Sequence, residues 1–313
     1  EVLVRVHASS LNGADIETLS GWWLVRMASP LRPASRIGGS DVAGVVERAG
    51  PGVTELQPGD EVLGDLSEHG FGAFADYVAV PVGALAPKPP SLTLLEAAAV
   101  PSAAWVAIKG IRDQRVIDED SQVLINGAGG GMGTYAIQMA AARGARVTGV
   151  DVADKLELIR SLGATRAIDY RTEDPTRTDQ RYDLILDMQA RRSVGDWRRV
   201  LAPDGAYLMV GGAARRIILG TLQGQLARSS SQHIGILPGW PHSRKDMEQT
   251  HELIESGRVR PAIDRTYPLA RTAEALRYMA DGCVRGKVVI QIAGGQAPAD
   301  TQAGEATQEM SRQ

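Results

Sequence analysis

Short segments with an alternating apolar and polar pattern dominate the first 90 residues. Glu1–His7 and Asp41–Glu47 show the patterning of strands. Glycine and proline mark turns between them at 50–52 and 58–60. Helical periodicity is weak here, so we predict a compact, strand-rich unit that ends near the prolines at 87–90.

The pattern changes from about residue 92. A helix is predicted over Ala97–Ile111, a strand over Val123–Asn126, and a second helix that continues to Arg143, where Gly144 is placed to end it. Strands at 146–150, 166–169, 182–187, 206–210 and 233–237 and a helix at 155–162 extend this alternation. Strands joined by helical crossovers form a parallel sheet that is covered on both faces.

The last part of the chain again shows short strand patterns like those of the first 90 residues. A helical face over 247–254 ends at Gly257, and strand patterns follow at Ala262–Tyr267 and Lys287–Ile292. We expect the last strand to complete the N-terminal unit. From about residue 294 there is no hydrophobic pattern, which predicts a disordered tail.

The composition excludes several classes of protein. The chain has 313 residues, of which 43% are hydrophobic and 23% charged, as is ordinary for a globular protein of about two domains. A net charge of −3 without long basic runs argues against non-specific binding to nucleic acid or membrane surfaces. No apolar run approaches the roughly 18 residues that span a bilayer. The one cysteine, Cys283, cannot form an internal disulfide, and a reducing cytoplasm is the expected location.

A glycine-rich turn follows the predicted strand at 123–126. In the segment GAGGGMG, Ala128, Gly130 and Gly133 take the three small-residue positions of the dinucleotide-binding fingerprint. They would permit a tight turn, a close approach of backbone to pyrophosphate, and close packing of helix on strand, in that order. We assign Gly131 and Met132 to the same site, because the N-terminus of the helix offers free N–H groups to phosphates. A purely structural turn is the alternative.

An acidic residue, Asp151, ends the next strand, about 20 residues beyond the glycines, as the fingerprint requires. Its carboxylate can accept the ribose hydroxyls of NAD and would repel the 2′-phosphate of NADP. Asp154 adds negative charge, whereas Lys155 and Arg143 can swing towards a phosphate. We therefore expect NAD(P)H as cofactor, with NADH slightly favoured. Capping of the following helix is the alternative role of Asp151.

With these motifs identified, the chain resembles the zinc-free, quinone-oxidoreductase-like branch of the medium-chain dehydrogenases/reductases over roughly residues 1–292. The segments that carry the resemblance are GSDVAGVVERAGPGV with PGDEV, VLINGAGGGMGTYAIQ, LIRSLGATRAIDY and RGKVVI. The resemblance implies an α/β protein, with a GroES-like β-barrel catalytic domain, a Rossmann domain with a doubly wound parallel sheet, and a cleft between them. It also adds Tyr170, Gly211 and Lys287 to the expected cofactor contacts.

On this basis we divide the chain into four segments. Residues 1–100 form the N-terminal part of the catalytic domain, 101–257 the cofactor-binding domain, 258–293 the return to the catalytic domain, and 294–313 the tail. The chain begins inside a strand and without Met, which indicates a fragment whose first strand or two are missing.

The segment Gln232–Leu237 bears on assembly. It is apolar, carries no charge apart from a possible one on His233, and lies where relatives place an edge strand that pairs across a dimer. We therefore expect a homodimer. The alternative is that a loop at 213–228 folds over this edge.

The resemblance also identifies the positions at which zinc ligands would be expected. The ligand positions of the zinc alcohol dehydrogenases align with Asn12, Ser40 and Ser102, which do not form a zinc site. Cys283 lies too near the C-terminus to replace a ligand. The histidines are scattered, with no two at ligand spacing on one element: His7, His69, His233, His242 and His251. We expect no metal site.

Without a Lewis acid the substrate must accept hydride readily, as quinones and enones do. Asn12 can donate its amide to the oxygen that gains charge, and Asp15 follows at the Asn-x-x-Asp spacing of the family. A turn role for Asn12 and a helix-capping role for Asp15 are the alternatives. The expected function is an NAD(P)H-dependent reductase of quinones or α,β-unsaturated carbonyls acting on a small molecule. An alcohol or aldehyde oxidoreductase, or an NAD(P)H-binding sensor or scaffold with little turnover, are the other hypotheses.

Some positions depart from the family pattern and leave the substrate open. Met188-Gln189-Ala190 stand where the family often has a Val-Gly pair, and Val106 where many relatives have Thr beside the nicotinamide. Trp22 and Trp23 either line one wall of the substrate site or serve only in packing.

Overall fold

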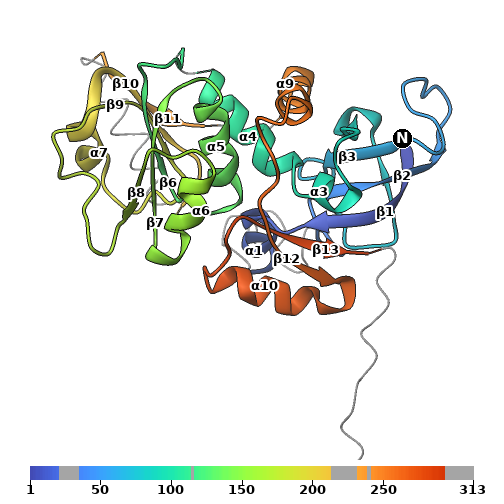
Figure 1. The fold of residues 1–313 in the computed structure, drawn as a ribbon. Coiled ribbons are helices and arrows are strands. Elements are labelled where there is room, and N and C mark those ends of the chain that lie inside the picture. Colours follow the sequence, from blue (N-terminus) through green and yellow to red (C-terminus); the bar gives the residue numbers. More distant parts are fainter. Residues whose placement is uncertain (21–34, 114–115, 213–230, 238–240, 293–313) are drawn as a thin grey trace, which may run out of the picture.

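Two sheets, one mixed and one parallel, organise the protein in the computed structural model, which describes residues 1–20, 35–113, 116–212, 231–237 and 241–292. Figure 1 shows the two sheets side by side, with helices α4 (Pro101–Arg112) and α9 (Arg244–Glu255) where the two halves meet. Trp22, Trp23, the loop at 213–228 and the tail at 294–313 lie outside the described residues. Within the described residues, none of the helices combines the length and the apolar character that crossing a membrane requires.

The mixed sheet joins strands from both ends of the chain, as the sequence predicted. Its order is β12-β13-β1-β2-β3-β5, and β4 pairs with β1. β13 runs antiparallel to β1, with Ser10 opposite Val289. The strands are β1 (Val2–Ser10), β2 (Asp41–Ala49), β3 (Glu61–Asp65), β4 (Tyr77–Val80), β5 (Leu85–Pro87), β12 (Ile263–Pro268) and β13 (Lys287–Gln291). Their alternating pattern buries Val2, Val4 and Val6 in one apolar cluster.

The second sheet is parallel and has the order β11-β10-β9-β6-β7-β8. Its strands are β6 (Gln122–Asn126), β7 (Arg146–Asp151), β8 (Arg166–Asp169), β9 (Tyr182–Asp187), β10 (Leu201–Met209) and β11 (His233–Ile236). Helices α5 (Gly131–Ala141), α6 (Leu156–Ser161) and α7 (Val194–Val200) connect them. The chain order reverses between β6 and β9, and ligands of open parallel sheets bind at the carboxyl ends of strands beside such a reversal.

The helix predicted over residues 97–111 is two helices, so that prediction was wrong. α3 (Leu94–Ala98) begins with a capping box in which Thr93 and Glu96 each bond the other's backbone N–H. α4 then begins at Pro101, whose fixed φ and missing N–H suit the first position of a helix and cannot continue a preceding one. The sequence reading also gave no bounds for α1 (Gly13–Ser20) or for the strands β3, β4 and β5.

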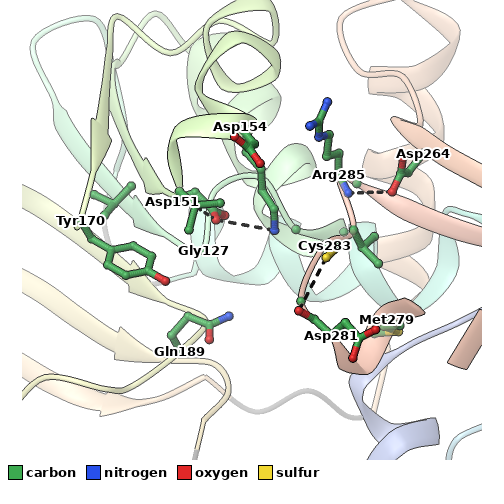
Figure 2. Close-up of a pocket in the computed structure, with 18 of the residues that line it drawn as sticks. Gly127, Asp151, Asp154, Tyr170, Gln189, Asp264, Met279, Asp281, Cys283 and Arg285 are labelled. Carbon is green, nitrogen blue, oxygen red and sulfur yellow. Dashed lines mark hydrogen bonds and ion pairs between the residues drawn. The ribbon is translucent and has the colours of Figure 1, made fainter. Parts of the chain in front are cut away.

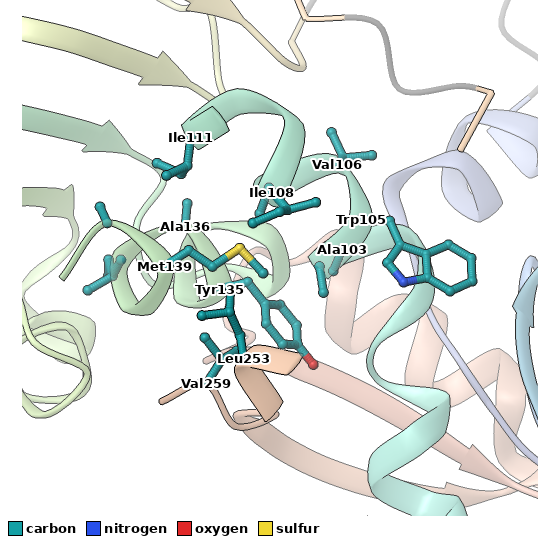
Figure 3. Close-up of a cluster of buried hydrophobic side chains, with 14 of the residues drawn as sticks. Ala103, Trp105, Val106, Ile108, Ile111, Tyr135, Ala136, Met139, Leu253 and Val259 are labelled. Atoms are coloured by element: carbon teal, nitrogen blue, oxygen red, sulfur yellow. The ribbon is translucent and has the colours of Figure 1, made fainter. Parts of the chain in front are cut away.

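α4 is buried along nearly its whole length and connects the two halves. Figure 3 shows Ile108 and Ile111 packed with Tyr135 and Met139 of α5, while the ring of Trp105 points to the opposite side. The remaining elements are a short helix, α10 (Thr272–Ala280), and the helical turns at 82–84, 153–155 and 269–271.

Candidate active site and cofactor cleft

A cavity of about 1050 Å³ lies between the glycine-rich turn of the parallel sheet and the C-terminal strands of the mixed sheet. One wall is formed by residues at the ends of β6, β7, β8 and β9, and the other by β12, α10 and residues 281–286 (Figure 2). It therefore occupies the crevice where this topology places ligands. Four of the predicted cofactor contacts line the cavity: Gly130, Gly131, Asp151 and Tyr170.

The glycine-rich turn has the tight geometry that its sequence predicted. Gly127 has φ +87°, which favours glycine. A Cβ on Gly133 would lie 2.3 Å from the carbonyl oxygen of Gly127, so only glycine lets α5 approach the turn. A Cβ on Gly130 would meet only that same oxygen, at 3.4 Å, which is ordinary contact. Gly133 is thus required for packing, and Gly130 faces the cavity.

The C-terminal segment closes against this turn. The N–H of Gly286 donates to the carbonyl oxygen of Gly129 at 2.9 Å, and Gly130 and Gly286 form a β-bridge. The aliphatic part of the Lys287 side chain passes close to Gly131, where an added Cβ would lie 2.7 Å from Cδ of Lys287. The phosphate-binding turn is therefore held in contact with the mixed sheet.

Asp151 lines the cavity and also braces the turn. Its Oδ2 accepts the N–H of Gly129 at 2.9 Å, and its Oδ1 accepts the N–H of Val152 at 2.9 Å. The ammonium group of Lys155 lies 3.6 Å from Oδ1. The helical turn that follows takes Val152 as its N-cap, so the alternative role of Asp151 as the cap of that helix was wrong.

Positive side chains outnumber negative ones around the cavity. The cations are Lys155, Arg171, Arg191, Arg192, Arg265 and Arg285, and the anions are Asp151, Asp154, Asp264 and Asp281. This balance suits a cofactor that carries several phosphates. Arg143, which the sequence also offered, does not reach the cavity: it lies beyond the far end of α5 and donates to the carbonyl oxygen of Met139.

Five other predicted cofactor contacts do not line this cavity: Ala128, Met132, Gly133, Gly211 and Lys287. Ala128 is fully buried behind the turn. Gly211 follows the carboxyl end of β10, where an added Cβ would lie 2.8 Å from the carbonyl oxygen of Met188. The side chain of Gln189, in contrast, lines the cavity and lies near Gly127. It follows β9, where the chain departs from the family pattern.

Lys287 belongs to a buried polar network next to the cavity. Its ammonium group donates to Oδ1 of Asn12 at 2.6 Å, to Oδ2 of Asp41 at 3.1 Å and to the carbonyl oxygen of Leu11 at 3.2 Å. The amide nitrogen of Asn12 donates to Oδ2 of Asp41 at 2.8 Å and to Oγ of Ser40 at 3.0 Å. Both amide hydrogens of Asn12 are therefore already used.

Asp41 is the centre of this network and was missed by the sequence reading. It is fully buried, and its carboxylate also accepts the hydroxyl of Ser10 at 2.6 Å and the N–H of Ser102 at 3.0 Å. Its charge is balanced by Lys287, 246 positions away. The signal was present in the segment GSDVAG, where an acidic residue opens an otherwise apolar strand.

Asp15 holds the backbone around Asn12. Its carboxylate accepts the N–H of Asn12 at 2.8 Å and the N–H of Gly39 at 3.2 Å. Burial raises the pKa of the Asp15 carboxyl to about 6. Asp15 thus joins the start of α1 to the segment that carries Ser40 and Asp41.

The donor set at the aligned zinc positions does not fit zinc. Asn12 and Ser40 bond each other, and Ser102 contributes its backbone N–H to Asp41. Amide and hydroxyl groups are weak zinc ligands, and the Lys287 ammonium beside them would repel a dication. In the part of the chain that the structure describes, no three His, Cys, Asp or Glu residues are grouped as a metal site would need.

Comparison with known proteins gives the family. Residues 1–90 match the family model described as Alcohol dehydrogenase GroES-like domain, and residues 162–290 match the one described as Zinc-binding dehydrogenase. The human mitochondrial protein named NAD(P)H oxidoreductase RTN4IP1 is 32% identical, over 93% of this chain and 82% of its own length. The NADPH-dependent alkenal/one oxidoreductase of Arabidopsis thaliana chloroplasts is 31% identical, over 93% of this chain and 72% of its own.

Solved structures agree with this assignment. The quinone oxidoreductase of Coxiella burnetii has a TM-score of 0.80 and 25% identity, over 93% of this chain and 90% of its own. This structural similarity agrees with the sequence relatives, with the two family matches and with the presence of one mixed and one parallel sheet in this structure. The chain belongs to the medium-chain dehydrogenase/reductase superfamily, in its quinone-oxidoreductase-like branch.

Proposed function

We propose that this protein transfers a hydride from NAD(P)H to a quinone or an α,β-unsaturated carbonyl compound, without zinc. The observation that carries the proposal is that one side chain connects the phosphate-binding turn with the polar network around Asn12. The aliphatic part of Lys287 passes over the turn, and its ammonium group donates to Asn12 and Asp41. Relatives named alkenal/one oxidoreductase and 2-methylene-furan-3-one reductase support the substrate class.

The residues of the chain bind, orient and polarise. When bound, NAD(P)H supplies the hydride. The glycine-rich turn would hold its pyrophosphate, and the Lys287–Asp41 pair fixes the orientation of Asn12. Asn12 can donate to a substrate oxygen by giving up its bond to Ser40. Ser40 is a second candidate donor, because in the described residues its hydroxyl accepts from Asn12 and no acceptor is found for its own hydrogen.

Quinones and enones fit this arrangement better than simple aldehydes. Hydrogen bonds from an amide or a hydroxyl polarise a carbonyl less than a metal ion does. An acceptor whose added charge delocalises onto oxygen needs less help. Asp15 remains proposed as a residue of the catalytic site, where its contacts support a role in holding Asn12.

For the cofactor, we retain a slight preference for NADH. Asp151 and Asp154 disfavour a 2′-phosphate at their end of the cavity, whereas Lys155 and Arg171 favour one. Each carboxylate oxygen of Asp151 already accepts one backbone N–H, from Gly129 or Val152. Only the remaining lone pairs could accept the ribose hydroxyls of NADH and so support this preference.

The direct test is a panel of quinones, enones and aldehydes with NADH and NADPH, followed by the absorbance of the reduced nicotinamide. We expect turnover of quinones or enones that survives a chelator, with no stoichiometric zinc by metal analysis. Preferred turnover of aldehydes would support the alternative of an alcohol or aldehyde oxidoreductase. Tight cofactor binding with no oxidation by any acceptor would support a sensor or scaffold.

We also infer a homodimer that forms through β11, the last strand in the described part of the parallel sheet. A cytoplasmic location remains a prediction from the cysteine content, and similar proteins are named as mitochondrial or chloroplastic.

A further inference from the structure

A buried pair of side chains connects the two halves of the protein. Nε2 of His242 lies 2.9 Å from Oδ2 of Asp65. Asp65 ends β3 of the mixed sheet, and His242 lies between β11 and α9 of the cofactor-binding half. The side chains are 6% and 1% exposed, so the contact is shielded from water.

Asp65 is adjacent to the polar network. In the antiparallel pairing of β2 with β3, Asp65 stands opposite Asp41. The next residue, Leu66, donates its N–H to the carbonyl oxygen of Ser40 at 2.7 Å. A displacement of Asp65 would therefore move the strand that carries Ser40 and Asp41.

His242 is held firmly on its own side. The ring of Trp105, on α4, stands edge-on to the His242 ring with 5.2 Å between centroids. One turn further along α4, the ammonium group of Lys109 donates to the carbonyl oxygen of Pro241 at 2.5 Å. Arg112 pairs with Asp246, in the first turn of α9, at 2.8 Å. α4 thus fixes the segment that carries His242.

Stability alone is a poor explanation for this pair. Burying an ionisable pair costs desolvation energy that apolar side chains of similar size would not. Nδ1 of His242 is also buried and finds no hydrogen-bond partner in the described part of the chain. A buried polar contact can serve instead to specify one relative geometry of the parts that it joins.

We propose that the His242–Asp65 pair is an interdomain latch, which sets how the carboxyl ends of the parallel sheet face the Asn12–Asp41 network. The latch is a positioning device and touches no reacting atom. In the proposed function, it would fix the distance between the nicotinamide and the substrate site. Hydride transfer is sensitive to such distances, since a misplacement of about 1 Å can cost roughly 100-fold in rate.

The test compares His242→Leu, which breaks the latch, with His242→Gln, whose amide nitrogen can reach Asp65. Arg244→Ala is the matched control, because Arg244 pairs with Glu55 across the same two halves, at 3.4 Å, with both side chains exposed. For His242→Leu we expect kcat with an enone to fall at least tenfold, while the Kd for NAD(P)H changes less than twofold. The isotope effect with cofactor deuterated at the transferred position should rise. Gln should restore most of kcat, and Arg244→Ala should match the wild type.

An unchanged kcat in His242→Leu would overturn the latch, and so would a fall in kcat matched by an equal loss of cofactor affinity. If His242→Leu does not fold, His242→Ala takes its place as the variant that breaks the latch, with the same expected and contradicting outcomes, and His242→Gln is still expected to restore most of kcat. Hydrogen exchange tests the latch without any need for enzymatic turnover. The exchange rate of the Leu66 amide should rise in His242→Leu and should not change in Arg244→Ala. Unchanged exchange overturns the latch even if no acceptor is found, whereas absence of turnover in the wild type contradicts only the proposed function.

Discussion

At the scale of single residues, the structure assigns several candidate side chains a supporting role. Asn12 was expected to donate to substrate, but Asp41 and Ser40 already take both of its amide hydrogens. Lys287 is predicted to contact the cofactor, and in the structure its ammonium group bonds Asn12 and Asp41. These contacts depend on side-chain directions and on partners that are far apart in sequence.

Asp15 gives a prediction for pH. Its pKa is about 6 in the folded protein, against 3.8 as the ordinary value that we take for the unfolded chain. The folded state therefore binds this proton more tightly, so the stabilisation is full below about pH 4 and is lost as the pH rises through about 6. The difference in pKa corresponds to about 3 kcal/mol.

Asp15→Asn removes this titration. The free energy of unfolding of the wild type minus that of the variant, from urea denaturation, should fall by about 2.4 kcal/mol between pH 4 and pH 7. Asp179→Asn, at an exposed position, is the control and should show no such trend. A difference that does not vary with pH would mean that Asp15 titrates alike in both states.

Asp151 gives a prediction for cofactor choice. Asp151→Ser removes a negative charge from the cavity while the hydroxyl can still accept one N–H of the turn. We expect the ratio of kcat/KM for NADPH to that for NADH to rise about tenfold, which corresponds to ~1.4 kcal/mol of relieved repulsion. Asp154→Ser, which changes the same charge in the same cavity, should have the smaller effect. A lower KM for NADPH in the wild type would contradict the proposed preference.

At the scale of elements, the glycine-rich turn allows binding to be separated from folding. Gly130→Ala places a Cβ in ordinary contact, so the cost in stability should be only about 1 kcal/mol, typical of Ala at an N-cap. Gly130→Val fills the cavity where backbone must approach pyrophosphate, and we expect cofactor binding to be lost in a folded protein. Gly133→Ala forces a 2.3 Å contact with the backbone and should lower the melting temperature by several degrees or more.

Thermal denaturation and fluorescence titration with NADH measure both effects. Normal affinity in a folded Gly130→Val variant would show that the cofactor does not bind at this turn. A stable Gly133→Ala variant would show that α5 can move away from the turn.

Elements with a strong local signal were predictable. β9 has the bounds that its apolar run predicted, because strands buried in a parallel sheet read as nearly continuous hydrophobic segments. The bounds predicted for β8 are also those of the structure, although only Ile168 of that strand is buried. The short strands β4 and β5, with four and three residues, carry too few positions to show a period. The break before α4 was missed because the apolar pattern continues through Pro101, and the proline was not weighed against it.

At the scale of the whole molecule, the succession of the two sheets along the chain was predictable from the sequence, but the contacts that join them were not. The return of β13 to the first sheet followed from its strand pattern and the family resemblance. The His242–Asp65 contact joins positions 177 residues apart, and neither neighbourhood carries a motif. Such pairings depend on how the two halves pack, which no local pattern encodes.

The assembly of the molecule gives the last prediction. β11 pairs with β10 on one side and is the last strand in the order of the described sheet, with Ile236 43% exposed. The N–H of Leu237 donates to Met209 of the β10 side, at 2.9 Å. Because N–H groups alternate along a strand, those of Ile234 and Ile236 point to the free edge. An apolar edge whose N–H groups find no partner among the described residues favours pairing with a second copy of the chain.

Ile236→Pro removes one outward N–H and should leave the pairing with β10 intact, so we expect a dimer in the wild type and a monomer of 33.3 kDa in this variant. Ile234→Lys, which adds a charge at the same edge, should also weaken the dimer, whereas Ile236→Val keeps the N–H and the apolar surface and should not. Light scattering at micromolar concentration distinguishes these states. A monomeric wild type would exclude the dimer, and dissociation of Ile236→Val would mean that side-chain volume, rather than backbone pairing, holds the two copies together.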